Sequence, residues 1–122
     1  ITVIPYSPLG GGLLTGKYAQ GGTGRLTEDA RYNARYGQSW MHETANSLAK
    51  LAHEVGADPA TLAVAWAAAH PANVHPIISA RSVTQLIPSL AAEQFRMSPE
   101  LYAQITDLSI TPPPATDRLE EA

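Results

Sequence analysis

Hydrophobic positions along this chain group into short runs and into helical stripes, which together predict two strands and four helices. Residues 1–4 are β-branched throughout, which is typical of a strand covered on both faces, and the prolines at positions 5 and 8 end it. A second short apolar run, residues 74–78, lies between proline-containing turns and predicts a second strand. Helical spacing dominates the rest of the chain beyond residue 40.

The first two predicted helices follow one another closely. Apolar residues recur at alternating intervals of four and three over residues 41–55, which predicts an amphipathic helix that ends at Gly56 as its C-terminal cap. Asp58, followed by a proline, predicts the N-cap of a second helix over residues 60–70. Because this second helix is apolar nearly all round, we expect it to be buried, with Trp66 in the core.

Two further helices are predicted after the second strand. Ser82 is a suitable N-cap for a helix over residues 83–92, in which Pro88 should introduce a kink. The last helix starts at Ser98, and its spacing predicts a buried stripe of Leu101, Ile105 and Leu108. Residues 110–122 contain three consecutive prolines and a polar end, so they are expected to form an extended tail.

Eight of the nine glycines precede Gln38, so residues 10–39 are predicted to form a long mobile connection instead of a packed element. This connection carries four cations and three tyrosines, and such side chains could fold over a bound anion. The alternative is a solvated loop with ordinary surface charges. The cations and tyrosines are Lys17, Arg25, Arg31 and Arg35 with Tyr18, Tyr32 and Tyr36.

The order of the elements predicts an α/β fold with a parallel pair of strands joined by a helical crossover. Two strands cannot close a sheet or bury both of their faces, so we expect residues 1–122 to be one part of a larger parallel α/β domain. The chain also begins inside a predicted strand without a methionine, which leads us to expect that its beginning is missing.

Composition narrows the classes of function. The 122 residues are 44% apolar, and the formal net charge of −3 comes with no basic run, which argues against a nucleic-acid surface. The absence of cysteine excludes disulfides and thiolate zinc sites, and the four histidines lack metal-ligand spacing. No apolar run approaches the roughly 20 residues that span a membrane. We therefore expect a soluble, cytoplasmic protein that binds neither nucleic acid nor membrane.

Two stretches offer an anion-binding chemistry. The glycines of residues 10–16 let the backbone approach an anion closely, and Lys17 can place a positive charge there. Arg81 is the only Lys or Arg between Lys50 and Arg96, and it lies just past the carboxyl end of the second predicted strand, where α/β folds place their ligands. The first turn of the helix capped by Ser82 adds exposed amides.

A nucleotide P-loop is the first alternative, because Gly11, Gly16 and Lys17 match the opening of that motif. The match fails at Tyr18, where a Ser or Thr would hold magnesium, and glycines follow where a helix should start. The second strand also lacks a terminal aspartate for the metal.

Taken together, residues 6–18 (YSPLGGGLLTGKY) and residues 75–86 (HPIISARSVTQL) closely resemble the C-terminal part of aldo/keto reductases. The resemblance covers essentially the whole chain, including the closing SPELYAQITDLS segment. It implies a (β/α)8 barrel of the TIM type, of which this chain would supply the seventh and eighth strands with their helices and a terminal extra helix. It also implies NADP(H) as the cofactor and a small aldehyde or ketone as the substrate.

The resemblance assigns cofactor contacts residue by residue. Tyr6 stands where the family stacks an aromatic ring on the nicotinamide, Lys17 would contact a phosphate, and Arg25 would reach the cofactor from the long loop. The turn after the first strand would lie along the pyrophosphate through Ser7, Pro8, Leu9, Gly10 and Gly12. The turn after the second strand would hold the adenosine phosphate through Ser79, Ala80, Arg81 and Gln85.

Departures from the family pattern affect the contacts expected with the adenosine end of the cofactor. The family usually has glycine at Ser79, and an acidic residue followed by asparagine where Pro88 and Ser89 stand, as adenine and ribose contacts. Arg81 could compensate by pairing bidentately with a 2'-phosphate, which would favour NADPH over NADH.

No residue of this chain is assigned as catalytic. The family uses an Asp, a Tyr, a Lys and a His from the first half of the barrel, and this sequence matches none of those segments. We expect the complete protein, with its N-terminal barrel portion, to be an NADPH-dependent oxidoreductase and this chain alone to be inactive. The alternatives are a nicotinamide-nucleotide-binding sensor or accessory subunit of the same fold, and a truncated product that never folds.

Overall fold

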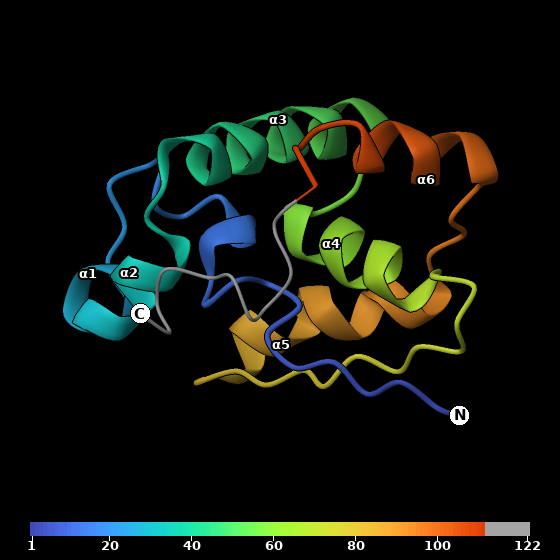
Figure 1. Ribbon diagram of the computed structural model, residues 1–122, viewed down its shortest axis with the longest axis horizontal. Helices are drawn as coiled ribbons and strands as arrows, with labels where there is room; N and C mark the ends of the chain where they lie inside the picture. The colour runs from blue at the N-terminus through green and yellow to red at the C-terminus, as the bar shows by residue number, and fades with distance from the viewer. Residues whose placement is uncertain (112–122) are drawn as a thin grey trace.

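The computed structural model describes residues 1–111, in which eight helical elements follow one another with extended segments at the beginning and after residue 72 (Figure 1). The prediction of an extended tail over residues 110–122 falls, except for its first two residues, outside the described part. The elements are η1 (Leu13–Thr15), α1 (Arg25–Glu28), α2 (Ala30–Tyr36), α3 (Ser39–Val55), α4 (Pro59–Ala68), α5 (Val83–Leu90), η2 (Ala91–Gln94) and α6 (Pro99–Thr106).

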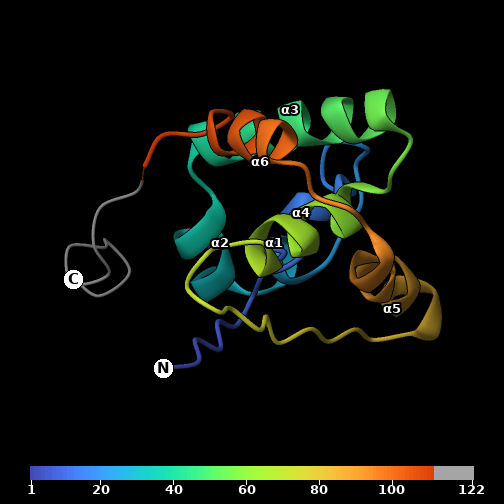
Figure 2. The ribbon, with the colours of Figure 1, turned by 90° about the vertical axis from the view of Figure 1, so that its right-hand side faces the viewer.

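Helix α4 occupies the middle of the structure. Figures 1 and 2 show α3 and α6 side by side in one layer above it, with α5 and the two extended segments on its other side. Leu62 on α4 is completely buried, and it packs in one cluster with Leu48 and Leu51 of α3 and Ile105 of α6. The prediction that the second helix is buried is therefore confirmed for its first six residues, 60–65, while residues 66 and 67 are partly buried and residues 68–70 are exposed.

The predicted helix ends are confirmed where a capping residue marks them. The Asp58 side chain accepts a hydrogen bond from the Ala60 amide at 2.8 Å, and Ser82 and Ser98 cap α5 and α6 in the same way. Gly56 ends α3 with φ of +74°, a left-handed conformation that favours glycine. Helix α3 begins two residues before the predicted start, and α5 ends at Leu90, two residues before the predicted end, where η2 takes over.

Trp66 lies at the margin of the core. It is partly buried and packs against the central cluster, while its indole Nε1 donates a hydrogen bond to Thr106 Oγ1 at 3.0 Å. Its ring stacks on that of Tyr102 with the centroids 5.7 Å apart. The predicted core position is thus confirmed in part, because the polar edge of the indole faces α6 instead of the interior.

The prediction of a long mobile connection over residues 10–39 is wrong. This segment forms η1, α1 and α2, and its side chains Leu13 and Leu26 are buried in a second cluster with Ala45 of α3. The glycines do not leave the segment unpacked. They supply the left-handed turns that direct Leu13 and Leu26 toward α3, so the glycine content signals sharp turns and not mobility.

The two predicted strands are present only as a minimal parallel pairing. Val3 and Val74 form an isolated parallel bridge. The paired stretch is too short to make either extended segment a strand. The expectation that residues 1–4 are covered on both faces is also wrong for this chain, because Ile1, Val3 and Ile4 are exposed. Two extended segments cannot cover each other's faces, and within residues 1–111 neither has a second strand beside it.

A buried hydrogen bond gives a physical role to the region around Pro88. Thr61 on α4 is buried, and its Oγ1 donates to the Pro88 carbonyl oxygen at 2.6 Å. The proline ring removes one donor from α5, while its carbonyl is satisfied from the neighbouring helix. This bond ties α5 to α4 near the end of α5.

We expect Thr61→Val to lower the free energy of unfolding by about 1–3 kcal/mol, because a buried carbonyl loses its donor while the side-chain volume stays nearly constant. Urea unfolding of the natural full-length protein that contains this sequence measures the effect. Thr23→Val is the matched control, since Thr23 is exposed. Equal stability of the two variants would contradict the role given to this bond.

Candidate functional site

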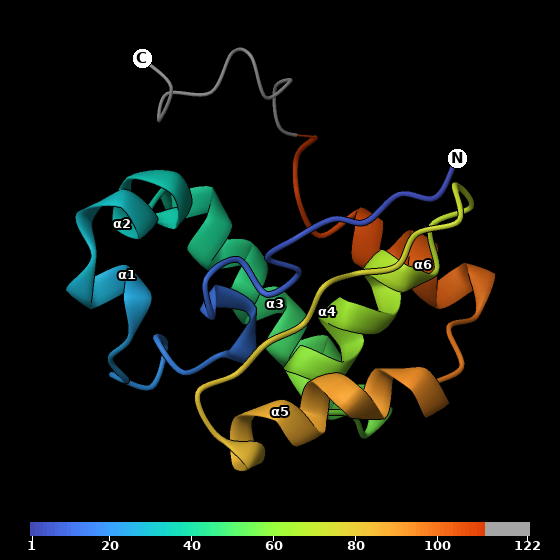
Figure 3. The ribbon, with the colours of Figure 1, turned by 90° about the horizontal axis from the view of Figure 1, so that it is seen from below.

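The parallel pairing places the carboxyl ends of the two extended segments side by side, at one edge of the paired segments. Three backbone hydrogen bonds define it, from Val3 N to Asn73 O at 3.2 Å, from His75 N to Val3 O at 2.8 Å and from Ile77 N to Pro5 O at 2.9 Å. Figure 3, seen from below, shows the two segments running side by side in the same direction across the face of the structure, and Figure 1 shows that they lie below α4. The glycine-rich turn and the turn that carries Arg81 therefore start from neighbouring positions.

The turn after the first segment has an unusual backbone. Ser7, Gly10, Gly11 and Gly12 all have positive φ, and Ser7 does so with a side chain, which is uncommon. The amides of Gly10 and Gly12 donate back to Ser7 O and Leu9 O. Within residues 1–111 we find no hydrogen bond from the amides of Leu9 and Gly11, so these two donors remain for an external acceptor.

Lys17 folds back over this turn. Its Nζ lies 5.1 Å from the centroid of the Tyr18 ring, and a Cβ added to Gly12 would lie 3.3 Å from the same Nζ. Gly12 also has φ of +95°, a left-handed conformation that favours glycine. The structure thus places a cation directly beside the glycine turn.

Arg25 lies at the start of α1 and is engaged by an aromatic side chain. Its guanidinium carbon is 5.4 Å from the centroid of the Tyr32 ring, and its Nη1 donates to Tyr32 Oη at 3.5 Å. The Leu26 amide donates to Tyr18 Oη at 3.1 Å, which joins α1 to the segment just after Lys17. These contacts hold Arg25 within the packed loop.

The turn after the second segment is exposed at Ser79, Ala80 and Arg81. Its shape is set by Gln85. The side-chain Oε1 of Gln85 accepts a hydrogen bond from the backbone amide of Arg81 at 3.1 Å, and the backbone amide of Gln85 donates to Ser82 Oγ. The Arg81 side chain reaches across to α1, where its Nη1 lies 3.8 Å from Glu28 Oε2. Sequence reasoning did not single out Glu28, because only the fold brings it to Arg81.

Two predicted contact residues lie in contrasting surroundings. The Tyr6 ring is 69% exposed at the end of the first segment, where it is free to stack on a planar group. Ser89 is 2% exposed and lies about two turns along α5 from Arg81. The structure brings the turns that carry the predicted residues to neighbouring positions, while Ser89 is buried on α5. The assignment of all these residues to the cofactor stays a prediction.

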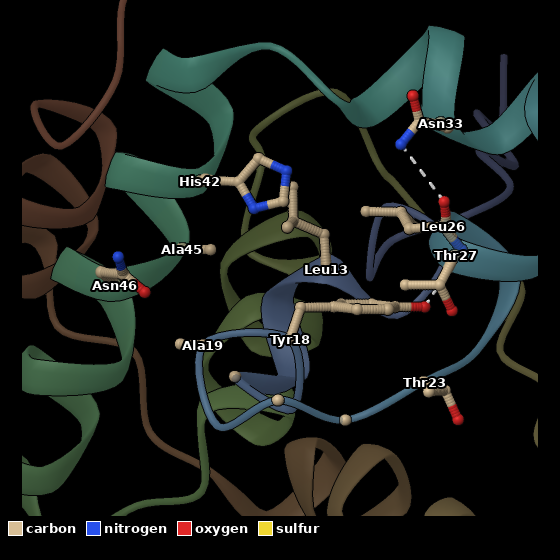
Figure 4. Close-up of a pocket in the computed structure, with 13 residues that line it drawn as sticks. Leu13, Tyr18, Ala19, Thr23, Leu26, Thr27, Asn33, His42, Ala45 and Asn46 are labelled. Atoms are coloured by element: carbon tan, nitrogen blue, oxygen red, sulfur yellow. Dashed lines mark hydrogen bonds between the residues drawn. The ribbon is translucent and has the colours of Figure 1, made fainter.

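A separate cavity of about 440 Å³ lies between the loop and α3 (Figure 4). Tyr18 and His42 both point into it, the first from the loop and the second from α3, and the Asn33 amide at its rim donates to Leu26 O. Its lining contains no Lys, Arg, Asp or Glu and none of the predicted cofactor contacts. This cavity is therefore separate from the two turns that carry the predicted contacts.

One carboxylate in the loop has a shifted pKa. Hydrogen bonds from the Arg31 side chain and amide lower the pKa of the Asp29 carboxyl, and the same contact raises the pKa of Arg31. Because the carboxyl is more acidic in the folded chain, its contribution to stability is present above its unfolded pKa and is lost as the pH falls through the folded value. The Arg31 side chain is 87% exposed and the Asp29 side chain 33%, so screening by solvent keeps this contribution small.

Within residues 1–111 no group of three or more His, Cys, Asp or Glu side chains could hold a metal ion. No helix in that part of the chain has the length and apolar character needed to cross a membrane.

The aldo/keto reductase family model matches residues 1–110. An "Uncharacterized oxidoreductase YrpG" of Bacillus subtilis is 32% identical over 106 residues, which cover 87% of this chain and 31% of that protein. A "Probable voltage-gated potassium channel subunit beta" of Oryza sativa is 32% identical over 123 residues, which cover 92% of this chain and 36% of that protein. A Schizosaccharomyces pombe protein with a similar name, also for a channel β subunit, is 31% identical over 120 residues, covering 88% and 34%.

This chain belongs to the aldo/keto reductase family, a family of oxidoreductases. The resemblance drawn from the two loop motifs is confirmed. The chain spans about a third of the length of the curated relatives it matches.

We expect Tyr18→Phe to loosen α1, because the Leu26 amide loses its acceptor. Hydrogen exchange at the Leu26 amide should become about three- to tenfold faster, as the loss of one neutral hydrogen bond implies. Tyr102→Phe is the matched control, since no hydrogen bond of the Tyr102 hydroxyl is found within residues 1–111. Unchanged exchange at Leu26 would show that the loop is held by packing alone.

Proposed function

We propose that this chain is the cofactor-holding part of an NADP(H)-dependent oxidoreductase that reduces aldehydes or ketones. The observation that carries the proposal is the common edge, at which the glycine turn and the Arg81 turn lie next to each other. One turn offers backbone donors and Lys17, and the other offers a guanidinium. A dinucleotide with separated phosphate groups matches two neighbouring anion sites better than a single small anion does.

The residues present fit the phosphate groups of such a cofactor. The free amides of Leu9 and Gly11 and the ammonium of Lys17 supply donors and charge where the family pattern expects the pyrophosphate. Gly12 leaves the room that a Cβ would take. Arg81, with 64% of its side chain exposed, is available for a 2'-phosphate.

The chemistry of the reaction would come from the nicotinamide, which exchanges a hydride with a carbonyl carbon. Tyr6 would orient the nicotinamide ring by stacking, and the glycine turn would hold the phosphates of the cofactor in place. No described residue is assigned to proton transfer, so the acid that protonates the carbonyl oxygen would come from outside residues 1–111.

We further propose that the chain forms the last two strands and their helices in a (β/α)8 barrel. Three features support this: the parallel pairing, the family membership, and apolar side chains that the described residues leave uncovered. On α5 they recur every three or four residues, which is the spacing of a helix face that packs against a neighbour. They are Val3, Ile4 and Ile77 on the extended segments and Val83, Ile87 and Leu90 on α5.

A second candidate function is a nicotinamide-nucleotide-binding sensor or accessory subunit. Its support is that two of the relatives carry names for channel β subunits. The two functions differ in turnover and not in cofactor binding. A cytoplasmic location is part of either proposal, and a chain without cysteines is compatible with that reducing compartment.

Consumption of NADPH by the natural full-length protein, tested with a panel of aldehydes and ketones, separates the two functions. Steady turnover with any of these substrates supports the reductase. Tight NADPH binding without turnover supports the accessory subunit.

We expect Arg81→Ala to weaken NADPH binding by about tenfold or more, the usual cost of losing a hydrogen-bonded charge, and NADH binding by less than about threefold. Fluorescence titration of the natural full-length protein measures both. Arg96→Ala is the matched control, because Arg96 is also exposed but lies between η2 and α6. Binding of ATP with magnesium in place of NADPH would reject the proposal and favour a P-loop.

A further inference from the structure

An ion pair joins the two loops of the candidate site. Glu28 ends α1 in the first loop and Arg81 follows the second extended segment, yet their Oε2 and Nη1 atoms are 3.8 Å apart. The two side chains are 56% and 64% exposed, so the pair faces solvent. Of the contacts found within residues 1–111, this is the one that engages the Arg81 guanidinium.

The position of Glu28 is set by the packing of α1. Leu26 is buried against α3, and its amide is bound by Tyr18 Oη. Thr27 Oγ1 accepts from the Gly24 amide and donates to the Gly24 carbonyl, each at 3.0 Å, which closes the first turn. Glu28 therefore starts from a backbone that is held in place, and its carboxylate is directed to the Arg81 turn by the fold.

The carboxylate of this ion pair is also easily replaced by another anion. The separation of the two groups is near the upper limit for an ion pair, and both side chains are solvated, so the carboxylate holds the guanidinium only weakly. A phosphate group carries more charge than a carboxylate and offers three oxygens to the planar guanidinium. The two anions would compete for the same donors, and they would repel each other if both stayed nearby.

We propose that Glu28 is a specificity-determining residue that opposes the binding of 2'-phosphorylated cofactors at Arg81. The proposal rests on the proposed function, because it takes the Arg81 guanidinium as the phosphate site. The negative charge of Glu28 lowers the affinity for NADPH and leaves that for NADH, which lacks the 2'-phosphate, nearly unchanged. Glu28 thereby sets how strongly the protein discriminates between the two cofactors.

The test is Glu28→Gln in the natural full-length protein, with NADPH and NADH dissociation constants measured by fluorescence titration. This substitution keeps the size of the side chain and removes its charge. We expect NADPH to bind about three- to tenfold more tightly, as the removal of one exposed charge allows, while NADH changes by less than about twofold. The gain should shrink when salt is raised, because screening weakens the repulsion that is being removed.

Two further variants separate a direct contact from a general charge effect. Glu54→Gln on α3 removes the same charge from an exposed side chain outside the two loops, and it should leave both affinities unchanged. In an Arg81→Ala background, Glu28→Gln should lose most of its effect, because the two residues act through one contact.

The outcomes are distinct. Weaker NADPH binding by Glu28→Gln would overturn the inference and make Glu28 a residue that orients Arg81 for the phosphate. Equal changes for NADPH and NADH, or an equal gain in Glu54→Gln, would also overturn it. If the unaltered protein binds NADH and NADPH equally well and Arg81→Ala changes neither, the phosphate role of Arg81 fails, and the inference falls with it.

Discussion

The parallel contact between residues 3–5 and residues 73–77 is the constraint on which the candidate site depends. Only three backbone hydrogen bonds form it, yet they decide that the glycine turn and the Arg81 turn leave from the same edge. The helices make this contact possible, because α3 and α4 bridge the chain between the two segments and bury Leu62 at the centre. A few directional bonds thus set the register, while apolar burial supplies most of the stability.

The first loop illustrates how local packing serves the site. Leu13 and Leu26 anchor it to α3, and Tyr18 and Thr27 fix the ends of its turns, so that Lys17 and Arg25 are presented from a held backbone. Lys17 stays beside the glycine turn, Arg25 lies against Tyr32, and Arg81 meets the loop from the opposite turn through Glu28. The charges of the site are therefore arranged by buried neutral side chains.

Much of this could be predicted from the sequence, because local signals were strong. Asp58, Ser82 and Ser98 marked helix starts, Gly56 marked a helix end, and the order of elements gave the parallel direction. The packing of the loop could not be predicted, since glycines that permit left-handed turns are indistinguishable in sequence from glycines that leave a segment mobile. The contact of Arg81 with Glu28 and the cavity beside His42 depend on tertiary geometry, which no local pattern encodes.

The exposed row of Ile1, Val3, Ile4 and Ile77 has a consequence for handling the isolated chain. Each extended segment keeps one edge of unpaired amides and carbonyls beside β-branched side chains, and such an edge is a template for intermolecular pairing. The formal net charge of −3 offers little repulsion to prevent it. On its own, the chain is therefore prone to self-association through strand edges, and the associated fraction should increase as its concentration and the ionic strength rise.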